Sequence, residues 1–432
     1  MSATPNLRDG LLIAGLGALI AVVFFWFGPV VTVQLLVSAV TYGLIALGLN
    51  VQWGYGGQFN FGVMGFLMLG GYAVVLTSYP INDAFWGSDG PALLGRAIVA
   101  AVIGLLLILG AHRVDRIGIT GAAKGFIVVV AWAVAYVGYR SQIDPATVLI
   151  EAEAGFIGGF GLPVLLSWIV GGVIAGAVAF LIGKAVLGLR TDYLAIATIG
   201  IAEIIRALLK NMDWLTRGTL TVSPLPWPVP APLDLLAMGV DDNRMALLFA
   251  RSFFLSVVVV AIAIIFLLLQ RAYAGPWGRM MRAIRDNYVA AESMGKDVKG
   301  RQVELFVLGA VLIGIGGAMM TTYVQLYDPA GYQPINHTFI VWVMVIVGGA
   351  GNNLGALFGG VLIIIAWNIS EPLSLLLFQW LDAAGQAIGL PAIPDVGSRA
   401  LQMRVFFLGL VIVLALRYAP RGLIPERVRK RD

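Results

Sequence analysis

The chain has no cysteine among its 432 residues, so disulfides, thiolate metal sites and cysteine nucleophiles are excluded. Charge is also scarce: Lys, Arg, Asp and Glu make up 12% of the residues, whereas ordinary soluble chains contain about 25%. Hydrophobic residues reach 59%. A soluble fold of this size would have too few charged side chains to cover its surface. The composition therefore favours a membrane protein.

Groups that carry enzyme chemistry are few as well. The chain has two histidines, His112 and His337, and contains neither an H-E-x-x-H nor a G-x-S-x-G pattern, which argues against a zinc peptidase or a serine hydrolase. The phosphate-binding pattern G-x-x-x-x-G-K-[ST] is absent too, because neither Gly-Lys pair, at 183–184 and 295–296, is followed by Ser or Thr. We therefore expect no enzyme active site, no metal and no resident cofactor. Any ATP, with its magnesium, is expected to be bound by a partner chain.

Long apolar runs account for much of the chain. Residues 11–33, 246–269 and 303–322 are nearly free of charge and reach the roughly 20 residues that cross a bilayer as a helix. The short strands of alternating polarity that are typical of a membrane β-barrel are not seen. We therefore predict an all-α polytopic transmembrane protein of about 10–12 helices. The candidate spans are residues 11–29, 31–51, 60–79, 94–111, 122–139, 163–187, 193–210, 248–270, 302–323, 338–349, 354–370 and 403–417.

Basic residues concentrate in two segments, 271–301 and 417–432. Positive charge marks the cytoplasmic side of a membrane protein, so we place both segments inside. An even number of candidate spans lies between them, and counting back puts the N-terminus inside as well. The prediction is N-in and C-in, although the remaining loops do not decide it by themselves. We therefore attribute the net charge of +5 to basic residues that lie beside the membrane spans and contact lipid, and not to nucleic-acid binding.

The segment 211–250 falls outside in this topology. It contains the run Ser223-Pro-Leu-Pro-Trp-Pro-Val-Pro-Ala-Pro232, and so many prolines cannot form a spanning helix. We expect an extracytoplasmic loop that is ordered as a cap, with an irregular linker as the alternative.

Ionisable residues inside the candidate spans are few. Glu203 and Arg206 lie three apart on one helix face and are placed to pair, and Glu371 lies at the outer end of its span. A transporter driven by protons or sodium usually needs carboxylates near the midplane of the membrane. Ion coupling is therefore not expected.

Two glycine-rich stretches interrupt apolar segments. The first is Gly54-Tyr-Gly-Gly-Gln-Phe-Asn-Phe-Gly62, preceded by Asn50, and the second is Gly348-Gly-Ala-Gly-Asn-Asn-Leu-Gly355. Irregular backbone is tolerated at membrane depth only where it is buried or faces water, so broken helices indicate a transport pathway. Close packing of helices through small residues is the alternative.

The segment 275–300 reads as two short helices in the cytoplasm. Arg279, Arg282 and Arg285 alternate with apolar residues, which indicates a short amphipathic helix. Asp286 is predicted to cap a second helix over 287–294, and Gly295 suits its C-terminal turn. A partner protein could grip such an exposed pair of helices. The alternative is an interfacial helix lying on anionic lipid.

Three stretches resemble, in the same order and spacing, motifs of the membrane subunits of bacterial ABC importers for branched-chain amino acids. They are Ala46-Leu-Gly-Leu-Asn-Val-Gln-Trp-Gly-Tyr-Gly-Gly-Gln-Phe-Asn-Phe-Gly62, Leu189-Arg-Thr-Asp-Tyr-Leu-Ala-Ile-Ala-Thr-Ile-Gly-Ile-Ala-Glu-Ile-Ile-Arg206 and Arg282-Ala-Ile-Arg-Asp-Asn-Tyr-Val-Ala-Ala-Glu-Ser-Met-Gly295. The third is similar to the cytoplasmic coupling loop of that family. The chain is nearest to the M type of its two permease subunits, over most of residues 30–80 and 163–370.

The sequence departs from the usual family pattern at three places that flank the presumed pathway. Val63 stands where the family usually has His, Thr216-Arg217-Gly218 stands for the usual Gly-Gly, and Ala356 stands near the usual proline. The resemblance implies transport of branched-chain or related amino acids. Urea or short amides are the alternative substrates within the family. A stand-alone secondary transporter is the alternative class, but it would leave the cytoplasmic helix pair unexplained, and a membrane enzyme or scaffold would need a polar cluster that the spans do not offer.

The resemblance also implies an organisation and a set of partners. It implies a single transmembrane permease domain over residues 1–432, with an inserted helix pair at 80–162 and a cytoplasmic coupling loop at 271–301. The implied partners are a second permease subunit, two ATP-binding subunits and a periplasmic solute-binding protein, in the bacterial inner membrane. Coupling to the ATPase is assigned to Arg282, Arg285, Asp286, Ala290, Ala291, Glu292 and Gly295. The translocation pathway is assigned to Asn50, Gly54, Gly57, Gln58 and Asn60.

Overall fold

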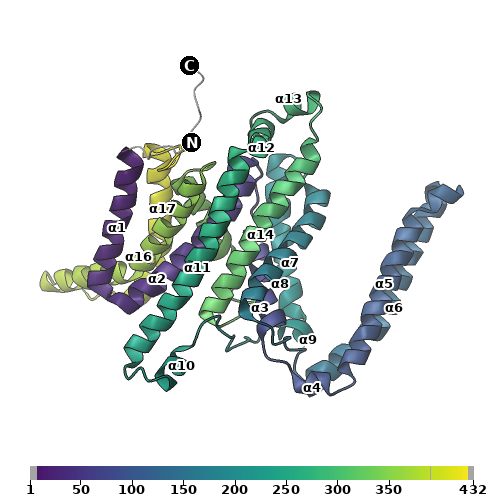
Figure 1. Ribbon diagram of the computed structural model, residues 1–432, viewed down its shortest axis with the longest axis horizontal. Coiled ribbons are helices and arrows are strands. Elements are labelled where there is room, and N and C mark those ends of the chain that lie inside the picture. Colours follow the sequence, from purple (N-terminus) through teal and green to yellow (C-terminus); the bar gives the residue numbers. More distant parts are fainter. Residues whose placement is uncertain (1–6, 390, 427–432) are drawn as a thin grey trace.

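The computed structural model describes residues 7–389 and 391–426 of the chain. Over these residues the protein is helical, and it contains only two isolated β-bridges and no strand (Figure 1). Each of the twelve predicted spans coincides with a helix, which confirms an all-α polytopic fold. Residues 427–432 of the predicted basic C-terminal segment lie outside the described residues.

Nine of the described helices are long and apolar enough to cross a membrane. They are α1 (Leu7–Phe27), α2 (Pro29–Leu49) with the π-helical turn η1 (Asn50–Tyr55), α5 (Gly90–His112), α6 (Gly121–Glu153), α7 (Val164–Val186), α11 (Asn243–Ala274), α14 (Val298–Val324), α16 (Asn353–Ala387) and α17 (Val396–Tyr418). Two shorter apolar helices are α3 (Val63–Ser78) and α15 (Ile340–Gly348), the latter entered through the π-helical turn η3 (Ile335–Phe339). The more polar α8 (Thr191–Asn211) completes the set of predicted spans.

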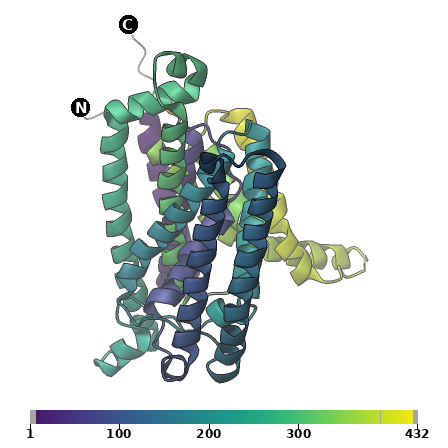
Figure 2. The same cartoon turned by 90° about the vertical axis from the view of Figure 1, so that its right-hand side faces the viewer.

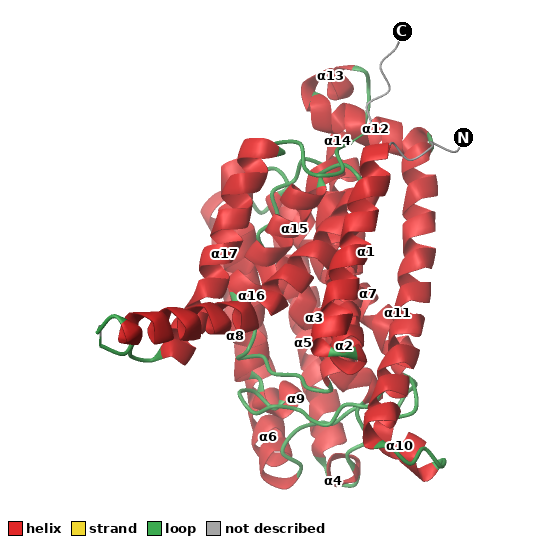
Figure 3. Ribbon diagram, turned by 90° about the vertical axis from the view of Figure 1, so that its left-hand side faces the viewer, coloured by secondary structure: helices red, strands yellow, loops and turns green. Residues whose placement is uncertain are grey.

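Four helices extend well beyond their predicted bounds, α6 and α16 at their C-terminal ends and α11 and α17 at their N-terminal ends, since α17 begins at Val396 and not at residue 403. The helix α6 continues to Glu153 and α16 continues to Ala387, each with a proline inside, Pro145 and Pro372. A proline removes one backbone hydrogen bond and bends a helix, but the helix can resume beyond it. The far part of α16 turns outward from the bundle (Figure 3). At the other end of the predicted loop 211–250, α11 already begins at Asn243.

The extended α16 also changes the position expected for Glu371. This carboxylate lies inside the helix and not at its end, and it forms an ion pair with Arg404 of α17. The guanidinium of Arg404 also lies 5.8 Å from the ring centre of Trp367. The predicted pair of Glu203 and Arg206 is confirmed, at 3.4 Å.

The helix α14 lies at the centre of the bundle and packs against α7, α3 and α2, while α16 packs against α2. Glycines allow these backbones to approach closely. A Cβ atom on Gly70 of α3 would overlap the Gly314 carbonyl oxygen of α14, and one on Gly317 would overlap the Leu67 carbonyl oxygen of α3. Close approach through small residues is the usual basis of helix packing in membranes. This packing accounts for many of the 54 glycines.

The helices α5 and α6 form a hairpin that stands apart from the bundle (Figure 1), and the hairpin lies in front of the bundle when the molecule is seen from that side (Figure 2). It is held near one end, where Asn82 Nδ2 donates to the Ala154 oxygen at 3.0 Å and to the Phe156 oxygen at 2.7 Å. Its outward side chains are apolar and exposed, among them Leu106 and Phe126. The residues 80–162 therefore contain a helix pair, and its status as an insertion relative to the family stays a prediction.

Two short helices, α12 (Pro276–Asp286) and α13 (Tyr288–Ser293), project at the end of the bundle where α1 begins (Figure 3). Asp9 of α1, Arg282 of α12 and Glu426 line one polar cleft there. The first and last described segments thus lie at the same end as the predicted coupling loop, as an N-in, C-in topology requires. Which end faces the cytoplasm stays a prediction.

The opposite end is covered by the segment between α8 and α11, which includes the short helices α9 (Asp213–Thr216) and α10 (Pro232–Ala237). Val222 and Tyr327 exchange two backbone hydrogen bonds of 3.0 Å, and the Leu225 N–H donates to the Gln325 oxygen at 3.0 Å. Both Val222 and Leu225 are buried. The proline-rich run is therefore ordered against the bundle.

Candidate functional site

The first part of the candidate site is the helix pair α12–α13. The helix α12 starts with Pro276, a favoured first residue because it has no N–H to leave unpaired. Its Met281 and Ile284 are buried. Ile284 joins Ala291 of α13 and Val298 of α14 in a small apolar cluster. This cluster ties the three helices together, so the pair is folded against α14 and is not an irregular loop.

The cap of α13 differs from the sequence-based prediction. Asn287 accepts the hydrogen bond from the Ala290 N–H through its Oδ1, at 3.0 Å. Asp286 was expected in this role, but it is the last residue of α12, and its carboxylate turns to Arg285 at 3.1 Å. The extended backbone of Asn287 is what an N-cap requires. At the far end, Gly295 has a positive φ of 74°.

The predicted coupling residues divide into an inward and an outward group. Ala290, Glu292 and Gly295 are exposed on α13 or directly after it. Ala291 is buried, so it packs the projection instead of contacting a partner. The remaining residues of the set lie on α12, where Arg282 and Arg285 turn toward the body of the protein.

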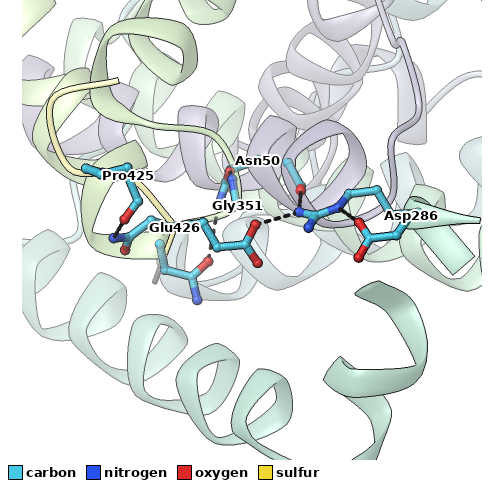
Figure 4. A network of polar contacts seen from close by, with 9 residues as sticks. Asn50, Asp286, Gly351, Pro425 and Glu426 are labelled. Atoms are coloured by element: carbon cyan, nitrogen blue, oxygen red, sulfur yellow. Dashed lines mark hydrogen bonds and ion pairs between the residues drawn. The ribbon is translucent and has the colours of Figure 1, made fainter. Parts of the chain in front are cut away.

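Arg285 makes the decisive contacts of α12 (Figure 4). Its Nη1 donates to the Gly54 oxygen at 2.6 Å and pairs with Glu426 Oε2 at 2.9 Å, while its Nε pairs with Asp286 Oδ1 at 3.1 Å. Burial lowers the pKa of this guanidinium, but Glu426 and Asp286 outweigh burial and raise the pKa above its ordinary value. The projection is thereby fixed to the first glycine-rich break.

The two breaks also touch each other. Asn50, at the start of η1, accepts a hydrogen bond from the Gly351 N–H through its Oδ1 at 2.8 Å and donates from Nδ2 to Asn353 Oδ1 at 3.3 Å. A Cβ atom on Gly54 would overlap both Asn50 Oδ1 and the Gly351 nitrogen. Gly54 is therefore required by the close approach of the second break, and both broken segments form one unit.

The other predicted pathway residues are held inside the bundle. Asn60 Nδ2 donates to Gln52 Oε1 at 2.7 Å, and Gln52 Nε2 donates in turn to the Phe306 oxygen at 2.8 Å. Gln58 Nε2 donates to the Gln302 oxygen at 2.7 Å. Asn60 is fully buried and Gln58 is 4% exposed, so in this conformation they shape the break and do not line an open channel. Gly57, with a positive φ of 66°, is exposed beside Arg285.

An aromatic cluster extends from the first break to α15. The ring of Trp342 lies 4.7 Å from that of Trp53, 5.5 Å from that of Phe59 and 4.6 Å from that of Phe61. Its Nε1 donates to the Asn60 oxygen at 3.0 Å. Trp342 is buried, whereas the other three rings are only half-buried. They form a continuous aromatic face next to the break.

Comparison with known proteins identifies the family to which this chain belongs. The chain matches the family described as "Branched-chain amino acid transport system / permease component" over residues 31–159 and 122–416. The chain belongs to this family. This membership confirms the predicted family and makes the chain a multi-pass membrane permease, and it does not favour a stand-alone secondary transporter.

Curated relatives of the permease agree in type at low identity. The chain is 24% identical over 409 residues to the probable branched-chain amino acid transport permease protein LivM of Methanocaldococcus jannaschii. This match covers 95% of the chain and 94% of the relative. The chain is 25% identical over 266 residues to the high-affinity LivM permease protein of Escherichia coli and 25% identical over 264 residues to that of Salmonella typhimurium. These two matches cover 59% of this chain and 56% of each relative. No solved structure matches the permease.

Sequence reasoning missed three residues of the permease site. Gln52 and Trp342 lie in apolar segments, and nothing in their spacing shows that both bond to Asn60. Glu426 is an acidic residue within the basic C-terminal segment. Its negative charge was the one available signal, because a carboxylate surrounded by basic residues suggests a specific partner.

Proposed function

We propose that this permease is the transmembrane subunit of an ATP-driven ABC importer, with ATP and magnesium bound by partner chains. The observation that carries the proposal is the link through Arg285, which joins the projecting helix pair to the first glycine-rich break at 2.6 Å. A stand-alone carrier would leave this projection unexplained. In an ATP-driven importer it is the element that a partner ATPase would move.

The outer surface of α13 supplies the contact for that ATPase. Tyr288, Val289 and Met294 expose 59%, 56% and 71% of their surface, and Glu292 is exposed beside them. Apolar side chains with a charged neighbour suit a groove on a soluble partner. When ATP binding closes two such subunits, the rigid projection would carry the motion to both breaks. Alternating access follows if the two conformations differ in affinity for the solute.

The remaining partners follow from the family and from the half-buried aromatic face. A second permease subunit would pack against the half-buried rings of Trp53, Phe59 and Phe61, with the solute path between the two subunits. A periplasmic solute-binding protein would deliver solute to the end formed by the segment between α8 and α11. We place the complex in a bacterial inner membrane.

Branched-chain amino acids are the proposed solutes, because the chain belongs to the branched-chain amino acid permease family and its LivM relatives are permeases of that type. The aromatic face suits an aliphatic side chain better than it suits urea, because apolar burial and not hydrogen bonding would supply the binding energy.

The proposal is tested by purifying the permease from its native host in mild detergent and identifying the proteins that accompany it. Recovery of a second permease and one or two ATPase chains, with uptake of leucine-type amino acids by the reconstituted complex, is the expected result. A homo-oligomer without any ATPase, or ATP-driven uptake of urea in place of amino acids, would overturn the corresponding part of the proposal.

A further inference from the structure

The segment that follows α17, residues 419–426, folds back over the second glycine-rich break, and we call it the C-terminal strap. Its Leu423 N–H donates to the Val347 oxygen at 2.8 Å, and its Ile424 N–H donates to the Gly348 oxygen at 2.9 Å. Asn352 Nδ2 donates to the Pro425 oxygen at 3.1 Å. Three hydrogen bonds thus bind the strap to the turn between α15 and α16.

The second break is shaped to receive the strap. The Ile424 carbonyl oxygen occupies the position that a Cβ atom on Gly349 would take, and a Cβ on Gly422 of the strap would overlap Gly349 in return. Ile424 is 1% exposed, so the contact is fully closed. Glycines at both positions are therefore required by the strap and not only by helix packing.

Glu426 then connects the strap to α12 (Figure 4). Its carboxylate pairs with Arg285 at 2.9 Å, and the side chain is 18% exposed. A Cβ atom on Gly351 would lie 2.8 Å from Glu426 Oε2 and 3.1 Å from Arg285 Nη1, so this ion pair rests directly on the second break. Arg285 also holds the first break through Gly54, and its other carboxylate partner, Asp286, is exposed on α12 itself.

We propose that the C-terminal strap, through Glu426, is the element that makes the second break move together with α12, so that Glu426 is a positioning residue for coupled transport. Without Glu426, no ion pair would tie α12 to the strap, and the hydrogen-bonded route from α12 to the second break would run through Gly54, η1 and the bond of Asn50 to Gly351. The proposal rests on the proposed function, because it assumes that α12 is the element that moves.

The test compares Glu426→Gln with wild type in the complete importer reconstituted in liposomes. We expect amino acid uptake per ATP hydrolysed to fall about fivefold, with assembly and ATP hydrolysis changed less than about twofold, since a residue that transmits coupling without touching either ligand changes it by a modest factor. Glu426→Asp keeps the negative charge and should restore part of the ratio. The control is Asp115→Asn, which breaks the 3.1 Å ion pair between Asp115, in the connection of the α5–α6 hairpin, and Lys124 of α6, away from both breaks.

Uptake per ATP unchanged in Glu426→Gln would overturn the proposal, and so would an equal fall in the Asp115→Asn control. A loss of assembly in Glu426→Gln, not repaired by Glu426→Asp, would show a merely structural role and would also overturn it. If wild type itself takes up no amino acid with any ATPase partner, the proposed function fails. A second measurement, with spin labels, then tests by itself whether Glu426 ties the strap to α12.

That second measurement needs no transport and exploits the absence of native cysteines in the chain. Spin labels are placed on cysteines at the exposed Arg279 of α12 and the exposed Arg421 of the strap. We expect one narrow distance distribution in wild type and a clearly broader one after Glu426→Gln. Identical distributions would show that Glu426 does not tie the strap to α12.

Discussion

Asn50 and Asn353 lie 303 positions apart in the sequence, yet Asn50 Nδ2 donates a hydrogen bond to Asn353 Oδ1 at 3.3 Å. The same Asn50 side chain accepts from the Gly351 N–H. One buried amide therefore joins the two glycine-rich breaks of the permease. Because a buried polar group is costly when it loses its partner, this side chain fixes how the two segments sit together.

Replacing Asn50 with alanine is expected to destabilise the permease by roughly 1–3 kcal/mol, because the buried Gly351 N–H loses its acceptor. The measurement is thermal unfolding of the purified protein in detergent. Asn368→Ala is the matched control, since its amide bonds only to the Ile364 oxygen of its own helix, at 2.8 Å. Equal melting temperatures for the two variants would contradict the role given to Asn50.

Gly54→Ala should prevent the two breaks from closing together, because the added Cβ would overlap Asn50 Oδ1 and the Gly351 nitrogen. We expect a strong loss of folded protein, monitored by size-exclusion chromatography. Gly200→Ala in α8 is the control, because nothing lies within 4 Å of its Cβ position, and there alanine should be neutral or stabilising by up to about 1 kcal/mol. A Gly54→Ala protein as abundant and as stable as wild type would refute the close approach.

Glu292→Lys and Gly295→Pro test the outward face of α13. The first reverses an exposed charge, and the second cannot adopt the positive φ of 74°. Both variants should stay folded in the membrane but lose uptake and co-purification of the ATPase. The control is Glu153→Lys, a charge reversal at the exposed end of α6. Normal uptake by both α13 variants would remove the coupling role of this helix pair.

Asn287→Ala should weaken α13 by about 1 kcal/mol, because the side chain that caps its N-terminus is lost. Hydrogen exchange of the Ala290 amide, the group capped at 3.0 Å, is the measurement, and it should accelerate. Asp286→Ala should leave that amide nearly as protected as in wild type. Faster exchange of the Ala290 amide in Asp286→Ala than in Asn287→Ala would show that Asp286 caps α13, as predicted from the sequence.

Local sequence patterns predicted the spans and the helix pair correctly. They were wrong about the cap of α13 and the end of α16, where contacts between side chains in the folded protein determine the structure. Asp286 and Asn287 are both good capping residues, and the choice between them depends on Arg285, which attracts the carboxylate. The end of α16 was placed too early because Glu371 and Pro372 suggest a boundary. The ion pair of Glu371 with Arg404 of α17 lies within the longer helix.

The pathway residues show the same division. The sequence alone shows that Asn60 and Gln58 are polar residues between apolar segments. That both are buried and bonded within the bundle depends on Gln52, Phe306 and Gln302, whose positions no local pattern reveals.

The sequence by itself determined the environment, the helical class and the family of this protein, because hydropathy over about 20 residues and short ordered motifs are local properties. The tertiary structure alone decided that α12, both breaks and the C-terminal strap meet around Arg285. Those segments are brought together by packing over more than 200 residues of chain, as in the contact of Arg285 with Gly54, 231 positions away. A contact between such distant residues depends on the whole packed bundle, so its physical cause cannot be read from either segment alone.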